Sequence, residues 1–313
     1  MSETSEKQIT HVKVIDFMAY RKVATMLSAL LLIVSIASLS INGLKFGLDF
    51  TGGTQLELAF ESPANLNQLR EQLASAGFED AVVVYFGEET DVMVRLQQEA
   101  TADLGDKVME ALRADGAKIT LKQLEFVGPQ VGEELRDDGG LGMLFALAVV
   151  MAYVAFRFQF KFSVGAVVAL AHDVIIVLGF FSLLQLDFDL TVLAAVLAVI
   201  GYSLNDTIVV SDRIRENFRR VRESSSAEVI NISLSETLGR TFVTSLTTLL
   251  VLIALFLVGG EIIHGFSIAL IVGVVVGTYS SVYVAANVLM MMNINRQDLM
   301  EPIKEGEEFD ELP

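Results

Sequence analysis

Residues 190–210 read LTVLAAVLAVIGYSLNDTIVV, and this stretch decides the fold. Its only charged side chain is Asp206. An α-helix rises 1.5 Å per residue, so about 20 apolar residues cross the roughly 30 Å hydrocarbon core of a membrane. The rest of the chain has the same character, because 53% of its 313 residues are hydrophobic. The stretch therefore predicts a membrane-spanning helix with one carboxyl group inside the membrane.

Five further apolar runs of similar length lie on both sides of this stretch. They cover residues 23–41, 139–156, 162–184, 241–258 and 266–292. We therefore expect a membrane α-helical fold with helix 1 at 23–41 and helices 2 to 6 within 139–292, around a loop at 211–240. The first run also has the small residues of a signal-peptide cleavage site, but it is long for a signal peptide.

The basic residues are distributed unevenly over the connections between the runs. The connections at 185–189 and 259–265 contain neither Lys nor Arg. The opposite set holds Lys7, Lys13, Arg21, Lys22, Arg157, Lys161, Arg213, Arg215, Arg219, Arg220, Arg222 and Arg240. The positive-inside rule then predicts a cytoplasmic N-terminal segment at 1–22, an acidic cytoplasmic tail at 293–313 and a periplasmic domain at 42–138.

The hydrophobic pattern of residues 42–138 is that of a water-soluble domain. Strand-like alternation is found at 54–60, 81–86, 91–96 and 118–126, and helical spacing at 65–76 and 102–114. The last strand pattern slips near Gln123. The order strand, helix, strand, strand, helix, strand predicts a ferredoxin-like α+β sandwich inserted after the first helix. That fold hosts many functions and identifies none of them.

Composition excludes several classes of function. The chain has no cysteine and three histidines that are far apart, so neither a thiol nucleophile nor a zinc site is expected. Its net charge of −17, concentrated at 42–140 and 296–313, argues against nucleic-acid binding. There is no phosphate-binding Gly-x-x-x-x-Gly-Lys motif and no nucleophile–base pair. We expect no enzyme activity, no cofactor and no metal.

Three charged side chains fall in or next to the apolar runs, and such groups are functional candidates. A charge at the bilayer centre costs at least about 2.5–3.5 kcal/mol on insertion scales. Asp206 shares a helix face with Tyr202 and Ser203, so this face is expected to point into the bundle. The alternative is a structural carboxyl group that is bonded to neighbouring hydroxyls. Asp173 is the second candidate, and its alternative is a structural hydrogen bond with adjacent His172.

Arg240 is the third candidate. A row of hydroxyls, Thr244, Thr247 and Thr248, follows it at helical spacing, and this arrangement suits a hydrated path. The alternative is an arginine that extends to lipid phosphates. Ser233-x-x-Glu236 has the spacing of a helix cap that would lead into Arg240, and the alternating charges of 212–217 predict a solvated helix face.

The sixth run presents small residues along one face. Gly273 and Gly277 are followed by Ser280, Ser281 and Asn287. Gly-x-x-x-Gly lets two membrane helices approach closely. We therefore interpret this face as a helix-packing surface.

Residues 200–217, IGYSLNDTIVVSDRIREN, closely resemble the fourth-span signature of the SecF family of bacterial protein-export proteins. Residues 47–53, GLDFTGG, resemble the motif that opens the first periplasmic domain of this family. Residues 171–173, AHD, and 238–241, LGRT, resemble motifs of its third and fifth spans. The similarity covers nearly the whole chain.

The resemblance implies a half-transporter of the resistance-nodulation-division superfamily in the bacterial inner membrane. SecD would supply the other six helices, and the pair would use the ion-motive force to help preproteins through the SecYEG channel, surrounded by membrane lipids. Asp206 and Arg240 fall on the family's proton-relay positions. Because the superfamily includes sodium-driven members, the ion stays open. The alternatives are a half-transporter for a small molecule or lipid, and a passive assembly factor.

The predicted orientation has a direct test, because the chain lacks cysteine. We expect Ser75→Cys, in the soluble domain, to react with a membrane-impermeant thiol reagent applied to intact spheroplasts. Ser225→Cys, in the basic connection, is expected to react only after lysis. The cysteine-free chain supplies the background, and the reverse labelling pattern would contradict the predicted orientation.

Overall fold

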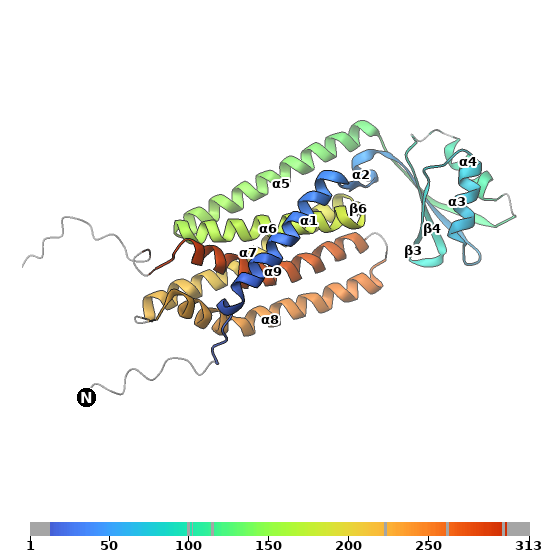
Figure 1. The fold of residues 1–313 in the computed structure, drawn as a ribbon. Coiled ribbons are helices and arrows are strands. Elements are labelled where there is room, and N and C mark those ends of the chain that lie inside the picture. The colour runs from blue at the N-terminus through green and yellow to red at the C-terminus, as the bar shows by residue number, and fades with distance from the viewer. Residues whose placement is uncertain are drawn as a thin grey trace, which may run out of the picture.

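The computed structural model describes residues 13–98, 101, 103–113, 116–221, 224–260, 263–295 and 298. A bundle of long helices carries a small α/β domain at one end (Figure 1). Six helices of the described part are long and apolar enough to cross a membrane. They are α1 (Arg21–Ile41), α5 (Pro129–Arg157), α6 (Phe160–Leu184), α7 (Leu190–Arg220), α8 (Ser226–Val258) and α9 (His264–Met291). The predicted six-helix membrane fold is confirmed.

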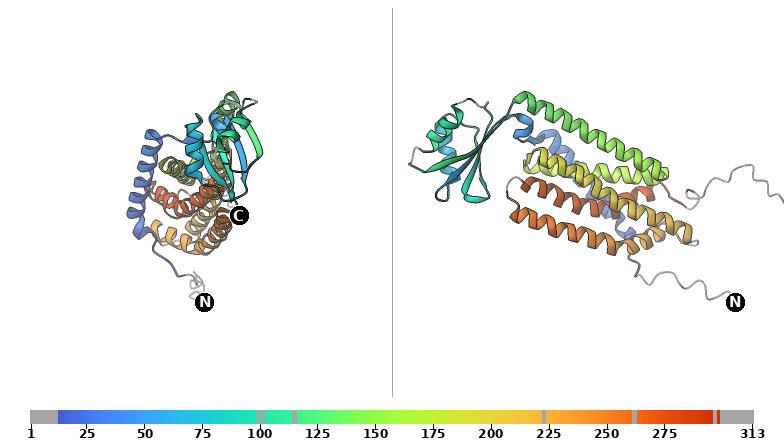
Figure 2. Two further views of the ribbon diagram at one scale, coloured as in Figure 1. Left: turned by 90° about the vertical axis from the view of Figure 1, so that its right-hand side faces the viewer. Right: turned by 180° about the vertical axis from the view of Figure 1, so that it is seen from behind.

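Helices α7 and α9 form the middle of the bundle. They make the most extensive helix–helix contact, and α6 packs against α9 beside them. Helix α1 crosses the bundle obliquely over α6, whereas α5 and α8 lie at its margins (Figures 1 and 2). A short 3-10 helix, η1 (Met18–Tyr20), precedes α1. The side chains that face α7 and α9 are therefore the ones most shielded from the surroundings.

Several helices extend well beyond the apolar runs. Most of the loop expected at 211–240 is helical, because α7 continues to Arg220 and α8 begins at Ser226. Ser225 caps α8 through a capping box with Glu228. The predicted cap at Ser233 and Glu236 is therefore wrong, since both residues lie inside α8. Hydropathy marks the part of a helix that contacts lipid, and these polar extensions carry no such signal.

The soluble domain has the predicted ferredoxin-like arrangement. Its strands pair in the order β3-β4-β2-β5, and all neighbours are antiparallel. The elements are β2 (Gly53–Phe60), α3 (Leu66–Ser75), β3 (Val82–Phe86), β4 (Glu88–Leu96), α4 (Leu104–Leu112) and β5 (Ile119–Val127). The ends expected for the second helix, 102 and 114, lie outside the described residues. The slip near Gln123 is a bulge, because Glu57 pairs with Gln123 and Leu58 with Leu121.

A compact joint connects this domain to the bundle. We use "the joint" for residues 45–53 together with 187–190. Strand β1 (Lys45–Phe46) pairs in parallel with β6 (Asp187–Phe188), and α2 (Leu48–Thr51) forms a single turn. The Gly47 amide donates to the Phe188 carbonyl at 2.9 Å. The sequence predicted none of these three short elements.

The joint forms hydrogen bonds with the first turn of α7. The Leu190 amide donates to Asp49 Oδ2 at 3.0 Å, and the Val192 amide donates to Asp189 Oδ1 at 2.8 Å. Glycine is required at position 53, because its φ is +133° and a Cβ there would clash with the Leu96 carbonyl.

An ion-pair cluster ties the joint to the sheet. Asp187 pairs with Lys45 at 2.8 Å and with Arg95 of β4 at 3.0 Å. The domain is thus attached to the bundle where α7 begins and also at α5, which follows β5 directly and packs against α2.

Small residues of α9 allow its close approach to α7. A Cβ at Gly273 would clash with Val199, and one at Gly277 would lie 3.2 Å from Ser203 Cβ. The two glycines of the face that the sequence marked as a packing surface therefore lie against α7 of the same chain, with no space for larger side chains, whereas Asn287 of that face contacts α1.

We expect Gly277→Leu to destabilise the bundle, because the added side chain must displace Ser203. Overpacking of this kind typically costs about 1–3 kcal/mol. The apparent melting temperature in mild detergent measures the effect. Gly142→Leu is the matched control, since nothing lies within 4 Å of a Cβ at Gly142. Equal melting temperatures for the two variants would mean that the α7–α9 contact is not tight.

Candidate functional site

Asp173 of α6 is completely buried in the middle of the bundle. Ser203 Oγ of α7 and Ser280 Oγ of α9 both donate to its Oδ2 atom, at 2.5 Å and 2.6 Å. His172 Nδ1 lies 2.9 Å from Oδ1. Three donors from three helices therefore satisfy this carboxyl group, and short hydrogen bonds of this kind stabilise a carboxylate away from water.

Asp206 of α7 is held in the same way by the neighbouring helices. Thr241 Oγ1 of α8 donates to Oδ1 at 2.6 Å, and Ser281 Oγ of α9 donates to Oδ2 at 2.5 Å. Ser280 and Ser281 are consecutive, so one turn of α9 serves both carboxyl groups. We call Asp173, Asp206 and their four hydroxyl donors Ser203, Thr241, Ser280 and Ser281 the two-carboxylate centre.

Tyr202 and Ser203 both point inward, but neither bonds to Asp206. Ser203 bonds to Asp173 instead. The Tyr202 hydroxyl donates to Ser245 Oγ at 3.2 Å, and Ser245 Oγ lies 2.7 Å from Thr278 Oγ1. A shared helix face thus gave the correct direction of these side chains without giving their partners. Thr241, Ser245 and Ser281 were missed as site residues, because their role depends on contacts between helices.

Arg240 lies on the exposed surface of α8, away from the centre. Within the described part of the chain its guanidinium group has no ion pair or hydrogen bond. Thr244 and Thr247 are also exposed. The three hydroxyls of the predicted row donate to backbone carbonyls of their own helix, at Arg240, Val243 and Thr244. The row therefore lines the outer surface of this chain and no path inside it.

This outer strip continues onto α7, where Gly201 and Asn205 are exposed. Polar side chains and an arginine are costly against lipid. The strip is therefore expected to face protein or water in the assembled state.

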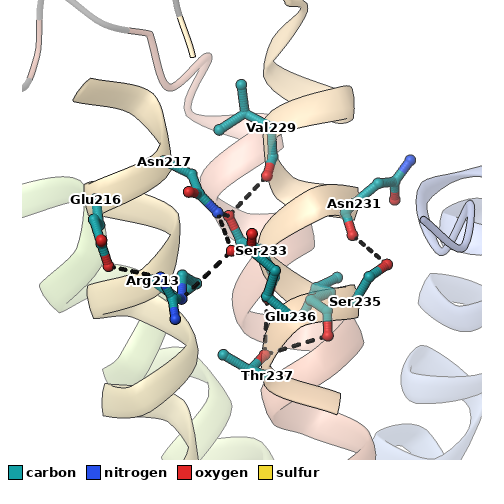
Figure 3. Close-up of polar contacts among 10 residues, drawn as sticks. Arg213, Glu216, Asn217, Val229, Asn231, Ser233, Ser235, Glu236 and Thr237 are labelled. Carbon is teal, nitrogen blue, oxygen red and sulfur yellow. Dashed lines mark hydrogen bonds and ion pairs between the residues drawn. The ribbon is translucent and has the colours of Figure 1, made fainter. Parts of the chain in front are cut away.

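The polar extensions of α7 and α8 lie beyond the centre, and hydrogen bonds and an ion pair connect them to each other (Figure 3). Asn217 Nδ2 donates to Ser233 Oγ at 3.0 Å and to Glu236 Oε2 at 2.8 Å. Arg213 Nε lies 3.5 Å from the same Glu236 oxygen. Asn217 is buried, whereas the alternating charges at 212–216 lie on the partly or fully exposed face of α7 that the sequence predicted. This network sets the register between the two helices that carry Asp206 and Thr241.

The N-terminal segment is attached to the same region. The Ile15 amide donates to Ser235 Oγ at 2.9 Å, and the Met18 amide donates to Asn231 Oδ1 at 3.0 Å. The described residues contain no group of three His, Asp or Glu side chains placed to hold a metal. The chemistry that the centre offers is therefore that of two carboxyl groups inside an apolar bundle: each can gain or lose a proton or bind a small cation.

Comparison with known proteins agrees with these features. The family model "Protein export membrane protein SecD/SecF, C-terminal" matches residues 107–295, and "SecD/SecF GG Motif" matches residues 37–64, which include the GLDFTGG joint. The "Protein translocase subunit SecF" of Pseudomonas aeruginosa is 55% identical over 92% of this chain and 94% of the relative. That of Vibrio alginolyticus is 50% identical over 96% and 98%.

The crystal structure of SecDF from Thermus thermophilus, described as a translocon-associated membrane protein, superposes with a TM-score of 0.81 at 39% identity. The match covers 90% of this chain and 39% of that longer chain. The chain belongs to the SecD/SecF family of protein-export membrane proteins.

Proposed function

We propose that this chain is a SecF-type translocase subunit that, together with SecD, uses an ion gradient to help preproteins cross through SecYEG. It acts as a coupling subunit and not as an enzyme. The observation that carries the proposal is the two-carboxylate centre, whose Asp206 lies in the middle of α7, the helix that the joint holds at its first turn.

Protonation of Asp206 changes its hydrogen-bonding capacity. The carboxylate accepts bonds from Thr241 and Ser281. The protonated acid carries one donor, so one of these hydroxyls must turn or the helices must shift. One charge that crosses 100 mV releases about 2.3 kcal/mol, enough to bias two arrangements of a packed bundle.

Helix α7 can transmit such a shift to the soluble domain. Asp206 lies sixteen residues after Leu190, which is about 24 Å along a helix. The joint bonds to the first turn of α7 through Asp49 and Asp189. A small tilt of α7 about its packed centre therefore moves the joint and the domain attached to it.

The outer strip of Arg240, Thr244, Thr247 and Asn205 supports SecD as a partner. This strip is polar, exposed in the single chain and adjacent to the centre, so a second six-helix half placed there would remove its contact with lipid. Arg240 would then have a partner from the other half. The remaining exposed surface of the bundle is rich in Leu, Val and Phe, as expected for a surface in contact with membrane lipids.

The proposed location is the bacterial inner membrane, with both termini in the cytoplasm and the soluble domain in the periplasm. The asymmetry of Lys and Arg between the connections supports this orientation. In Figure 1 the start of α1 and the soluble domain lie at opposite ends of the bundle, which fits one end on each side. The domain would then be on the side where a preprotein emerges.

We expect Asp206→Asn to reduce preprotein export in inverted vesicles to the level without an ion gradient, while the protein level and SecD co-purification stay normal. Asn keeps the shape of the side chain but cannot gain or lose a proton. Asp212→Asn is the matched control, since this residue is on the same helix in surface ion pairs with Arg157 and Arg215. Gradient-dependent export by Asp206→Asn at the level of the control would contradict the coupling role.

A further inference from the structure

A cavity of about 360 Å³ lies between α1, α6 and α9, on the side of the bundle away from the outer strip. It adjoins a second cavity of about 650 Å³ that reaches Arg21 and Lys22 at the start of α1. The two cavities share Thr25, Ala29, Asn287 and Met291. A continuous space therefore leads from the N-terminal end of α1 to the middle of α6.

His172 forms the wall of this space next to the two-carboxylate centre. Its side chain is 2% exposed, and its Nε2 atom has no hydrogen-bond partner in the described part of the chain. An unpaired buried polar atom destabilises the fold. The cavity that His172 lines has room for water, and a water molecule in it would satisfy this nitrogen.

The bonds of Asp173 fix the protonation pattern of the His172 ring. Ser203 and Ser280 occupy Oδ2 of Asp173, and His172 Nδ1 faces Oδ1 at 2.9 Å. With Asp173 ionised, its carboxylate only accepts hydrogen bonds, so in the neutral ring Nδ1 carries the proton. Nε2 is then the ring nitrogen with the free lone pair, in a side chain that lines the cavity.

Polar groups mark the route to this nitrogen. Thr25 and Ser28 follow Arg21 on one face of α1, and Asn287 of α9 bonds to Thr25 Oγ1 at 3.1 Å. Ser28 Oγ lies 2.9 Å from the Tyr279 hydroxyl. These groups retain free acceptor sites for water, whereas Leu32 and Ile175, one turn beyond Ser28 and His172, close the inner end with apolar side chains.

We propose that His172 is a proton carrier that connects Asp173 to water at the N-terminal end of α1. In the step, a proton from cavity water binds Nε2, and the Nδ1 proton moves to Asp173 Oδ1. The result is a neutral ring and a protonated Asp173, with no other bond changed. Ser280, which bonds to Asp173, is followed in α9 by Ser281, which bonds to Asp206. The inference rests on the proposed function and extends its relay to a second opening.

Few other ionisable groups act on His172. Asp173 is next to it on α6, and the Tyr279 ring of α9 lies 6.2 Å from it. Arg21 and Lys22 of α1 stand at the mouth of the route. No further charged side chain lines either cavity in the described part of the chain.

Cysteine labelling tests whether the route holds water. Ala171→Cys lies on the cavity wall beside His172, and Ala37→Cys lies on an exposed face of α1 outside both cavities. A negatively charged methanethiosulfonate reagent applied to inverted vesicles is expected to label the first and not the second. A cavity filled by lipid chains would leave Ala171→Cys unlabelled, and that result would overturn the proposal.

Proton-driven export tests the carrier role. His172→Asn keeps a donor toward Asp173 but cannot pass a proton on, so we expect it to lose proton-driven stimulation with normal SecD co-purification. His172→Ala is expected to regain proton uptake when free imidazole is added. Ala29→Leu, which narrows the route without removing an ionisable group, is expected to lose part of the stimulation, and Ala37→Leu none.

The outcomes separate this inference from the proposed function. Full stimulation of His172→Asn alongside a loss in Asp206→Asn would overturn the carrier role and leave the relay in place. Stimulation by a sodium gradient alone would also overturn it, because an imidazole ring passes protons and not sodium ions. Full stimulation in both variants would contradict the proposed function itself.

Discussion

Two carboxyl groups inside the bundle, the completely buried Asp173 and the partly buried Asp206, impose the constraint that organises it. An unpaired charge there would cost several kcal/mol, and hydroxyl donors from α7, α8 and α9 offset that cost. Those donors reach the carboxyl groups only if the helices approach closely, which explains why Gly273 and Gly277 stand where α9 crosses α7. The serine pair at 280 and 281 follows directly on this close contact. The same region of α9 therefore provides both the close contact with α7 and the hydroxyl groups that bond to the two carboxyl groups.

The same constraint gives α7 its mechanical role. Its middle is fixed by the two-carboxylate centre, its C-terminal extension by Asn217 and Glu236, and its first turn by the joint. A helix held at three points transmits a change at one of them to the others. Gly53 and the ion pairs of Asp187 attach the soluble domain where that motion arrives. In this account, gain and loss of a proton by the centre moves the domain on the far side of the membrane.

The sequence predicted what depends on local periodicity. Six apolar runs and an alternating strand pattern were sufficient for the bundle and the ferredoxin-like domain, and the charge of Asp206 marked the centre. The sequence did not predict the hydrogen-bond partners of these side chains. Ser203, for example, shares a helix face with Asp206 yet bonds to Asp173 of another helix. The threonine row after Arg240 was assigned to the interior, since one chain's sequence does not distinguish a face toward its own core from a face toward another subunit. The joint was missed as structure because its strands are two residues long and pair with each other across 142 positions of the sequence.

The distance between the soluble domain and the bundle is the quantity that this account requires to change with the charge at the centre. Spin labels at Ser75 of α3 and Leu183 of α6, both exposed, report it by pulsed electron resonance in the reconstituted complex with SecD. We expect the distance distribution of Asp206→Asn, which mimics the protonated centre, to differ from that of the otherwise unaltered chain, and that of Asp212→Asn to match it. Identical distributions for all three would show that the centre does not move the domain.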